Sequence, residues 1–93
     1  MALLTGGEIE SFTDANPGWR FDGEGLIRTF DFIDFNEAMG FVNRVALVAE
    51  RAFHHPDIGI SWNKVTIVLS THSEGGVTAK DTELAAKIGG FAG

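Results

Sequence analysis

The stretch of sequence that decides the fold is residues 34–56, DFNEAMGFVNRVALVAERAFHHP. Asp34 is typical of a helix N-cap, and Glu37 follows three positions later, as in a capping box. Beyond them runs an apolar stripe with helical spacing, which predicts one long helix lying across a sheet. The stripe consists of Phe35, Ala38, Met39, Val42, Val45, Ala46, Ala49 and Phe53. Because the residue before a proline avoids helical geometry, Pro56 predicts that the helix ends at about His54.

The chain before this helix predicts a short helix and a β-hairpin. Thr5 and Glu8 have the spacing of a second capping box. Apolar and polar residues alternate over residues 19–22, and the glycines among residues 22–25 indicate a turn. Residues 26–33 are rich in β-branched and aromatic side chains, which favour a strand.

The chain after the long helix predicts a second hairpin and a final helix. Residues 60–62 and 65–71 are typical of strands, with a turn at residues 63–64 between them. Alternation places Val65, Ile67, Leu69 and Thr71 on one face and Thr66, Val68, Ser70 and His72 on the other. The last helix is expected to begin near Thr78 and to end at the glycine pair 89–90.

The order of these elements, α-β-β-α-β-β-α, predicts the fold class. Hairpin connections make the four-stranded sheet mainly antiparallel. Helices gathered on one face of such a sheet give a two-layer α+β sandwich. At 93 residues, the chain is expected to form a single domain, residues 1–93.

Composition and charge exclude several classes of function. The 13 acidic residues outnumber the 7 basic ones, and the net charge of −6 disfavours direct binding to nucleic acid or anionic lipid. The chain has no cysteine, so disulfides and thiolate metal sites are excluded. No apolar run approaches the roughly 20 residues that span a bilayer, and the first six residues lack the pattern of a secretory signal. We therefore expect a cytoplasmic protein that does not bind a membrane.

The three histidines of the chain are the residues best suited to chemistry. His54 and His55 lie at the predicted end of the long helix, and His72 lies where a strand ends, so they would be held rigidly yet stay accessible. Glu50 precedes His54 by four residues, close enough on a helix to orient its imidazole. Since the unperturbed pKa of histidine is about 6.5, two imidazoles across a cleft could protonate one part of a substrate and deprotonate another. Such a pair could eliminate water without a metal or a covalent intermediate.

Several short segments, taken together, resemble one known family. They are Glu50–Asp57 (ERAFHHPD), Trp62–Val65 (WNKV), Leu69–His72 (LSTH), Gly76–Thr78 (GVT) and Asp81. From about Phe32 to Ile88, the chain is similar to the pterin-4a-carbinolamine dehydratases. The pattern is specific because it joins an acid, a His-His-Pro triplet, an aromatic residue, a Thr-His pair and a final aspartate at set spacings.

The resemblance implies a hydro-lyase that converts 4a-hydroxytetrahydrobiopterin to quinonoid dihydropterin and water by histidine general acid/base catalysis. It implies a pterin as the small-molecule substrate, no cofactor and no metal, and recycling of tetrahydrobiopterin for an aromatic amino acid hydroxylase. Family members have a four-stranded antiparallel sheet with helices on one face, and they assemble as homodimers or homotetramers. Carried over by position, the resemblance makes His54, His55 and His72 catalytic, and gives supporting or substrate-binding roles to Glu50, Thr71 and Asp81.

Four positions depart from common members of that family. Phe53 stands where an Asp or Asn often precedes the histidine pair, and Ile58 stands where some members have a tryptophan. Trp62 takes a frequent tyrosine position, and Lys80 replaces an arginine beside Asp81. The changes at Phe53 and Ile58 predict an altered pocket rim and leave the histidines intact.

Each candidate residue also has a structural interpretation. The histidine pair could stabilise the negative end of a helix dipole, Asp81 with Thr78 could simply start the last helix, and Glu50 could be a solvated helix residue. Trp62 is expected to pack in the core or in an interface. Three histidines could instead bind zinc, although neighbouring residues on a helix point in different directions, which makes joint ligation awkward.

The main alternative class is a non-enzymatic binding or assembly module on the same scaffold. The resemblance carries this alternative too, because some animal members act as dimerisation cofactors of a transcription factor. Residues 30–35 and 65–71 could build the interface of such a coactivator-like module, since an exposed sheet edge invites pairing with another chain.

Overall fold

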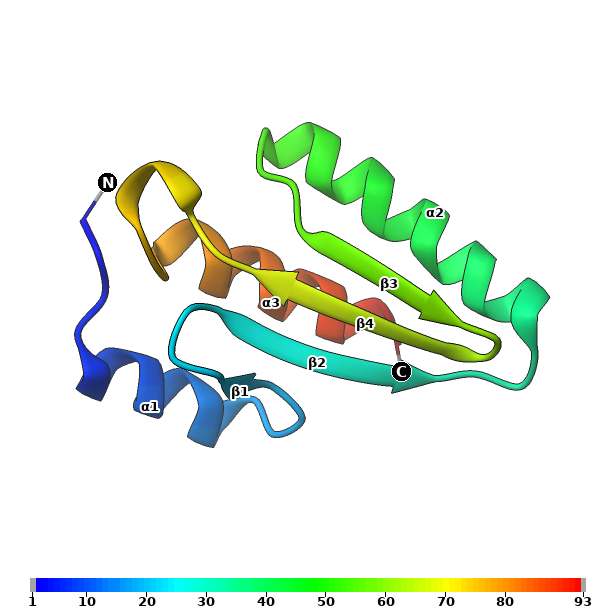
Figure 1. The fold of residues 1–93 in the computed structure, drawn as a ribbon, viewed down its shortest axis with the longest axis horizontal. Coiled ribbons are helices and arrows are strands. Elements are labelled where there is room, and N and C mark those ends of the chain that lie inside the picture. Colours follow the sequence, from blue (N-terminus) through cyan, green and yellow to red (C-terminus); the bar gives the residue numbers. More distant parts are fainter. Residues whose placement is uncertain (1, 93) are drawn as a thin grey trace.

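The computed structural model describes residues 2–92 and contains α-helices packed on a four-stranded sheet (Figure 1). Along the chain the elements are α1 (Gly6–Ala15), β1 (Arg20–Phe21), β2 (Leu26–Asp31), α2 (Phe35–Ala52), β3 (Asp57–Ser61), β4 (Lys64–Leu69), the short 3-10 helix η1 (His72–Glu74) and α3 (Ala79–Ala92). Neighbouring strands are antiparallel, in the order β1-β2-β4-β3. The predicted α+β class and order of elements are confirmed.

The core lies between the helices and one face of the sheet. β2 and β4 form the centre of the sheet, with Leu26 opposite Leu69 and Phe30 opposite Val65. These side chains are buried in one cluster with apolar side chains from α1, α2 and α3. Figure 1 shows α3 crossing behind β2 and β4. Because each fully buried Leu, Val or Phe side chain contributes about 1.5–3 kcal/mol, this face holds the two layers together.

α2 begins as the sequence predicted. The Asp34 carboxylate accepts a hydrogen bond from the Glu37 N–H at 2.8 Å, and the Glu37 carboxylate accepts one from the Ile33 N–H at 3.0 Å. This second bond ties Ile33 to the start of the helix. β2 therefore ends at Asp31, two residues earlier than predicted.

The apolar stripe of α2 differs in part from the predicted one. The buried residues are Ala38, Phe41, Val45 and Ala49. Phe41, absent from the predicted stripe, packs against the ring of Phe30 with 4.7 Å between centroids. Phe35, Ala46 and Phe53 are exposed, because a spacing of three, four and four residues turns these positions away from the sheet.

α2 ends at Ala52, two residues earlier than predicted, through a left-handed cap. Phe53 has φ 52° and ψ 38°, and its N–H donates to the carbonyls of Ala49 and Glu50. Left-handed backbone is costly for a residue with a side chain, and the ring of Phe53 is 85% exposed. The cap places His54 and His55 outside the helix.

The turn between β3 and β4 lies at Trp62 and Asn63, not at residues 63–64 as predicted. Asn63 is fixed by Phe32, because the Asn63 amide donates to the Phe32 carbonyl and the Phe32 N–H donates to the Asn63 carbonyl, both at 2.8 Å. Lys64 is thereby free to pair with Asp31 on β2. Trp62 has φ 51° and is 67% exposed, so it is not a core residue of this chain.

α3 continues through the glycine pair at which we expected it to end. Phe91 holds the last turn in place, since its ring packs on Phe41 at 5.8 Å between centroids and lies under the Arg44 guanidinium at 5.0 Å. At Gly89 the Arg28 side chain packs closely against the helix, because a Cβ at this position would lie 3.2 Å from a guanidinium nitrogen of Arg28. The glycine pair therefore does not terminate the helix.

Burial also limits the predicted interface. Phe30 and the inward residues of 65–71 lie in the core, so they are not free to contact another chain. Large apolar side chains that do reach the surface near these segments include those of Ile33, Phe35 and Trp62. Within residues 2–92, no helix combines the length and the apolar character that crossing a bilayer requires.

Replacing Phe53 by Asn should raise the free energy of unfolding by about 1 kcal/mol, because Asn tolerates left-handed backbone better than Phe does. Urea denaturation of both proteins measures the change. Phe53→Ala is the matched control, since it removes the same exposed ring and keeps an unfavourable φ. An equal gain in both variants would contradict the role assigned to the backbone.

The glycine pair of α3 offers a second test. Gly90→Ala should stabilise the protein by roughly 0.5–1 kcal/mol, as expected for an open helical position, because no heavy atom lies within 4 Å of the added Cβ. Gly89→Ala should give a smaller gain or a loss, since Arg28 must move. Thermal melts of the two variants compare them directly, and the reverse order would show that Arg28 does not restrict a side chain at position 89.

Candidate active site

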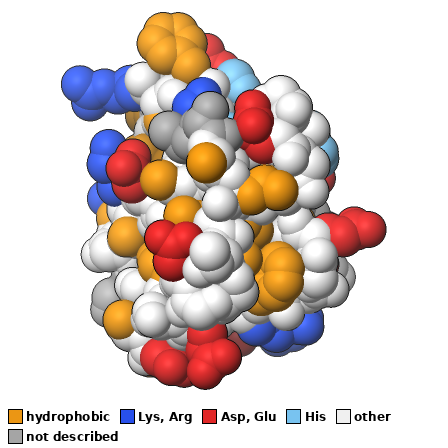
Figure 2. Space-filling view, turned by 90° about the vertical axis from the view of Figure 1, so that its left-hand side faces the viewer, with side chains coloured by type: hydrophobic (Ala, Val, Ile, Leu, Met, Phe, Trp, Pro, Cys, Tyr) orange, Lys and Arg blue, Asp and Glu red, His pale blue; other side chains and the backbone are white. Residues whose placement is uncertain are grey.

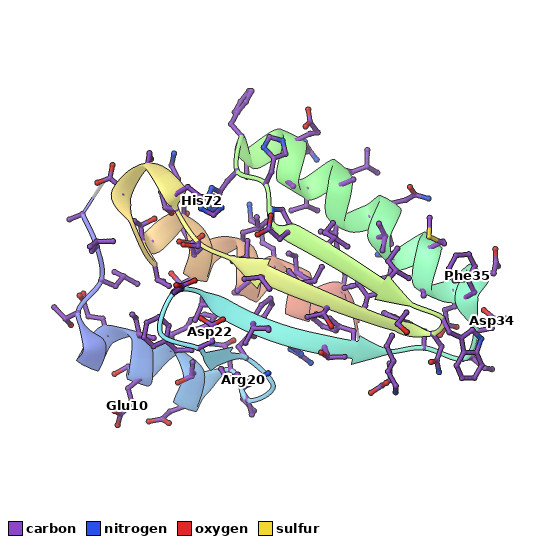
Figure 3. The ribbon with its side chains drawn as sticks, in the orientation of Figure 1. Glu10, Arg20, Asp22, Asp34, Phe35 and His72 are labelled. Carbon is purple, nitrogen blue, oxygen red and sulfur yellow. The ribbon has the colours of Figure 1, made fainter. Side chains whose placement is uncertain are left out.

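The three histidines lie at one end of the sheet. His54 and His55 connect the end of α2 to the start of β3, and His72 opens η1 just after β4. Because β3 and β4 are antiparallel neighbours, the start of one lies beside the end of the other. In Figure 3, His72 is near the end of α2, far from Asp34 and Phe35 at its beginning. Figure 2 looks toward this end and shows histidine surface beside acidic side chains.

His54 is held by a buried carboxylate. Its Nε2 lies 2.5 Å from Oδ1 of Asp81, and the two side chains are 11% and 0% exposed. A hydrogen bond to a carboxylate fixes both the orientation of an imidazole and the nitrogen that carries the proton. This contact joins the α2–β3 connection to the first turn of α3.

The second oxygen of Asp81 ties β4 to the same point. Its Oδ2 accepts from the Thr71 hydroxyl at 2.8 Å and from the Thr78 N–H at 2.9 Å. The hydroxyls of Thr71 and Thr78 lie 2.7 Å apart, and all three residues are buried. Asp81 therefore starts α3, as its structural interpretation held, and it also positions His54.

His55 and Glu50 form a separate, exposed pair. Nε2 of His55 lies 2.6 Å from Oε1 of Glu50, with the side chains 62% and 76% exposed. We expected Glu50 to orient His54, and this is wrong. Because the left-handed Phe53 ends the helix, the spacing of four residues no longer sets which side chains meet, and His55 turns back toward Glu50.

His72 is exposed and lines a hollow of about 290 Å³ on the uncovered face of the sheet. Its neighbour Thr71 is fixed by the backbone, since the Thr71 N–H donates to the Gly76 carbonyl at 2.8 Å. The other polar side chains of the hollow come from the start of β3, the residue after β4 and the β1–β2 turn: Asp57, Ser70, Asp22 and Glu24. Sequence reasoning did not single out these four residues. Alternation did place Ser70 on the same face as His72, which was a usable signal.

Asp22 is the most strongly held carboxylate of this hollow. The N–H groups of Gly25 and Glu24 donate to its Oδ1 at 2.8 and 2.9 Å. These bonds favour the ionised form, so they hold the pKa of the Asp22 carboxyl below its usual value. A fixed negative charge therefore lines the hollow that contains His72.

His54 lines a different hollow, of about 310 Å³, between the end of α2 and α3. Lys80, Glu83 and Lys87 from α3 contribute its charged side chains. The structure thus joins His54 to Thr71, the neighbour of His72, through Asp81, while the imidazoles of His54 and His72 open into separate hollows. Within the described part of the chain, no three His, Asp or Glu side chains are grouped so that they could hold a metal ion.

This arrangement supplies two imidazoles with different surroundings at the same end of the sheet. His54 is nearly buried and fixed by a carboxylate, whereas His72 is open to solvent beside several acids. One fixed and one accessible imidazole suit general acid/base chemistry on a small polar molecule, because a positioned imidazole can both give and accept a proton.

Comparisons with known proteins identify the family of this chain. The model of the family described as Pterin 4 alpha carbinolamine dehydratase matches residues 2–91. A relative from Thermomicrobium roseum, named as a pterin-4-alpha-carbinolamine dehydratase, is 50% identical over 88 residues, which cover 95% of each chain.

Solved structures agree as well. The crystal structure of a transcriptional coactivator/pterin dehydratase from Brucella melitensis is 42% identical, with a TM-score of 0.92, and the match covers 98% of this chain and 99% of that one. A pterin dehydratase-like protein described as a RuBisCO assembly factor in the alpha-carboxysome shares the fold, with a TM-score of 0.72 at 23% identity over 84% and 93% of the two chains. Family model and relatives match nearly the whole length, so the chain belongs to the pterin 4 alpha carbinolamine dehydratase family.

Proposed function

We propose that this protein dehydrates a 4a-hydroxytetrahydropterin to the quinonoid dihydropterin and water. The observation that carries the proposal is the buried His54–Asp81–Thr71 chain ending beside His72. It supplies a fixed imidazole at the position where the family sequence pattern has a histidine. Membership of the family supports the choice of a pterin as substrate.

The reaction needs two proton transfers and nothing more. The C–O bond at C4a breaks, the neighbouring ring nitrogen closes a C=N double bond, and that nitrogen loses its proton. One group must give a proton to the departing hydroxyl, and another must take the proton from nitrogen. Histidine can do both at neutral pH, so two imidazoles account for the chemistry.

We assign the proton transfers to His54 and His72, and the holding of the pterin to His55. His54 has a fixed orientation and His72 is accessible. A pterin that spans the two hollows would meet one imidazole at its C4a hydroxyl and the other at the neighbouring ring nitrogen. His55, exposed beside Glu50, is available to hydrogen-bond a bound ring. Asp81 and Thr71 support His54, and Glu50 supports His55.

The proposal also includes a source of the substrate, a cellular compartment and an oligomeric state. An aromatic amino acid hydroxylase that consumes tetrahydropterin would supply the 4a-hydroxy substrate. Both proteins would act in the cytoplasm. A homodimer or homotetramer is part of the proposal, because a 93-residue chain buries only about 60–65% of its unfolded surface. Large apolar side chains such as Trp62 and Phe35 are exposed in the single chain, which supports burial between copies.

Replacing His54 or His72 by Ala should lower the rate of dehydration by roughly 10²–10⁴-fold, the usual effect of losing a positioned acid or base. Stopped-flow absorbance with freshly generated 4a-hydroxytetrahydropterin measures the rate against the spontaneous reaction. Glu10→Gln, on the exposed surface of α1, is the control and should keep the wild-type rate. Full turnover in both histidine variants would refute the assignment.

A second candidate function is a non-enzymatic assembly or coactivator-like module. It is favoured by the exposed Ile33, Phe35 and Trp62 at the end of the sheet opposite the histidines. The rate of dehydration distinguishes the two functions, because a purely structural module would not accelerate the reaction above the spontaneous rate. A rate well above that background would instead reject the module as the sole function.

A further inference from the structure

We infer that Nδ1 is the atom of His54 that gains and loses the catalytic proton, and that the hydrogen-bond network behind Asp81 fixes this choice. The inference deepens the proposed function and rests on it. It also adds Thr78 to the site as a positioning residue.

The first step is the oxygen of Asp81 that faces away from His54. The Thr78 N–H donates to this Oδ2 at 2.9 Å. A backbone N–H is a donor only, so its direction cannot be reversed. Oδ2 of Asp81 must therefore act as an acceptor.

The second step concerns the two buried hydroxyls. The Thr71 hydroxyl has one proton and two polar neighbours, Oδ2 of Asp81 at 2.8 Å and Oγ1 of Thr78 at 2.7 Å. A carboxylate accepts only, so the Thr71 proton must point to Asp81, and the Thr78 hydroxyl must donate to Thr71. The N–H of Lys80, 3.3 Å away, supplies a donor to the Thr78 oxygen. Every donor in this chain thus points toward Asp81.

The third step reaches the imidazole. With Asp81 as a carboxylate, its Oδ1 also accepts only, so Nε2 of His54, 2.5 Å away, carries a proton in both the neutral and the cationic ring. Nδ1 is then the nitrogen whose protonation changes. Because Asp81 is fully buried and His54 nearly so, these bonds are less weakened by solvent than exposed ones.

This polarity has a sharp consequence for Asp81→Asn. The amide oxygen of Asn must stay beside the Thr71 hydroxyl and the Thr78 N–H, since both are donors. Its NH₂ group would then face Nε2 of His54, which has to accept. The ring proton would move to Nδ1, and the reacting nitrogen would be lost while the shape of the site is kept.

The experiment reads the tautomer of His54 directly. Long-range proton–nitrogen correlation NMR of ¹⁵N-labelled protein, recorded at rising pH until the His54 signals no longer change, distinguishes the two neutral tautomers. The His54 signals are identified by their absence in His54→Gln. We expect the Nε2–H form in the wild type and the Nδ1–H form in Asp81→Asn, together with a fall in kcat of about 10²–10⁴-fold.

Two further variants sharpen the test. Asp14→Asn makes the same chemical change on the exposed surface of α1 and should leave both tautomer and kcat as in the wild type. Thr78→Val should lower kcat with little change in KM, because Thr71 loses the donor that orients it, and Thr78→Ser should restore kcat. Equal losses of kcat in the Val and Ser variants would show that the Thr78 hydroxyl has no positioning role.

The outcomes separate this inference from the proposed function. A wild-type ring protonated on Nδ1, or an unchanged tautomer in Asp81→Asn, would overturn the assignment even if the protein dehydrates pterins well. A wild type with the Nε2–H tautomer but no dehydration above background would refute the proposed function and leave the polarity of the network standing. Should Asp81→Asn fail to fold, the wild-type spectrum alone decides.

Discussion

The carboxylate of Asp81 is the point where three parts of the chain meet without any exposure to solvent. Burying a charge is costly unless hydrogen bonds satisfy it. The protein satisfies this one with the end of β4 through Thr71, the start of α3 through Thr78, and the α2–β3 connection through His54. This end of the sheet is therefore organised around the hydrogen bonds that the buried Asp81 carboxylate needs.

The hydrogen bonds to Asp81 link the stability of the fold to the geometry of the site. The bonds that make burial of Asp81 tolerable are the same ones that fix the ring of His54. The helix start that the capping pattern predicts and the positioning of an imidazole are consequently one structure, although the sequence allowed them to be read as alternatives. His72, in contrast, is positioned by the turn after β4, and its side chain is exposed.

Features set by near neighbours in the sequence could be predicted. The caps at Thr5 and Asp34 and the inward face of β4 follow from spacing alone, and the structure has them. The position of the histidines at the ends of elements could be predicted from the ends expected for the long helix and the strand, and their catalytic role stays a prediction. The partner of Glu50 could not, since it depends on how the chain turns at Phe53. The continuation of α3 past its glycines depends on Phe91 reaching Phe41, a contact between distant segments.

Fold alone does not set what such a scaffold does. The RuBisCO assembly factor shares this fold at low identity, so the argument for chemistry has to come from the site residues. Those residues sit at one end of the sheet, and the exposed Ile33, Phe35 and Trp62 lie at the other. The layout leaves room for catalysis and association on the same small domain without competition for surface.

The left-handed residue at the end of α2 has one more consequence. By reversing the path of the chain, Phe53 sends two chemically identical neighbours into opposite environments, His54 toward a buried acid and His55 toward an exposed one. The different surroundings of the two histidines therefore follow from the backbone conformation at Phe53. Loss of Phe53 would move His54 into the cap position and His55 into the position that His54 now holds, so the length of the chain at this junction determines which histidine faces Asp81.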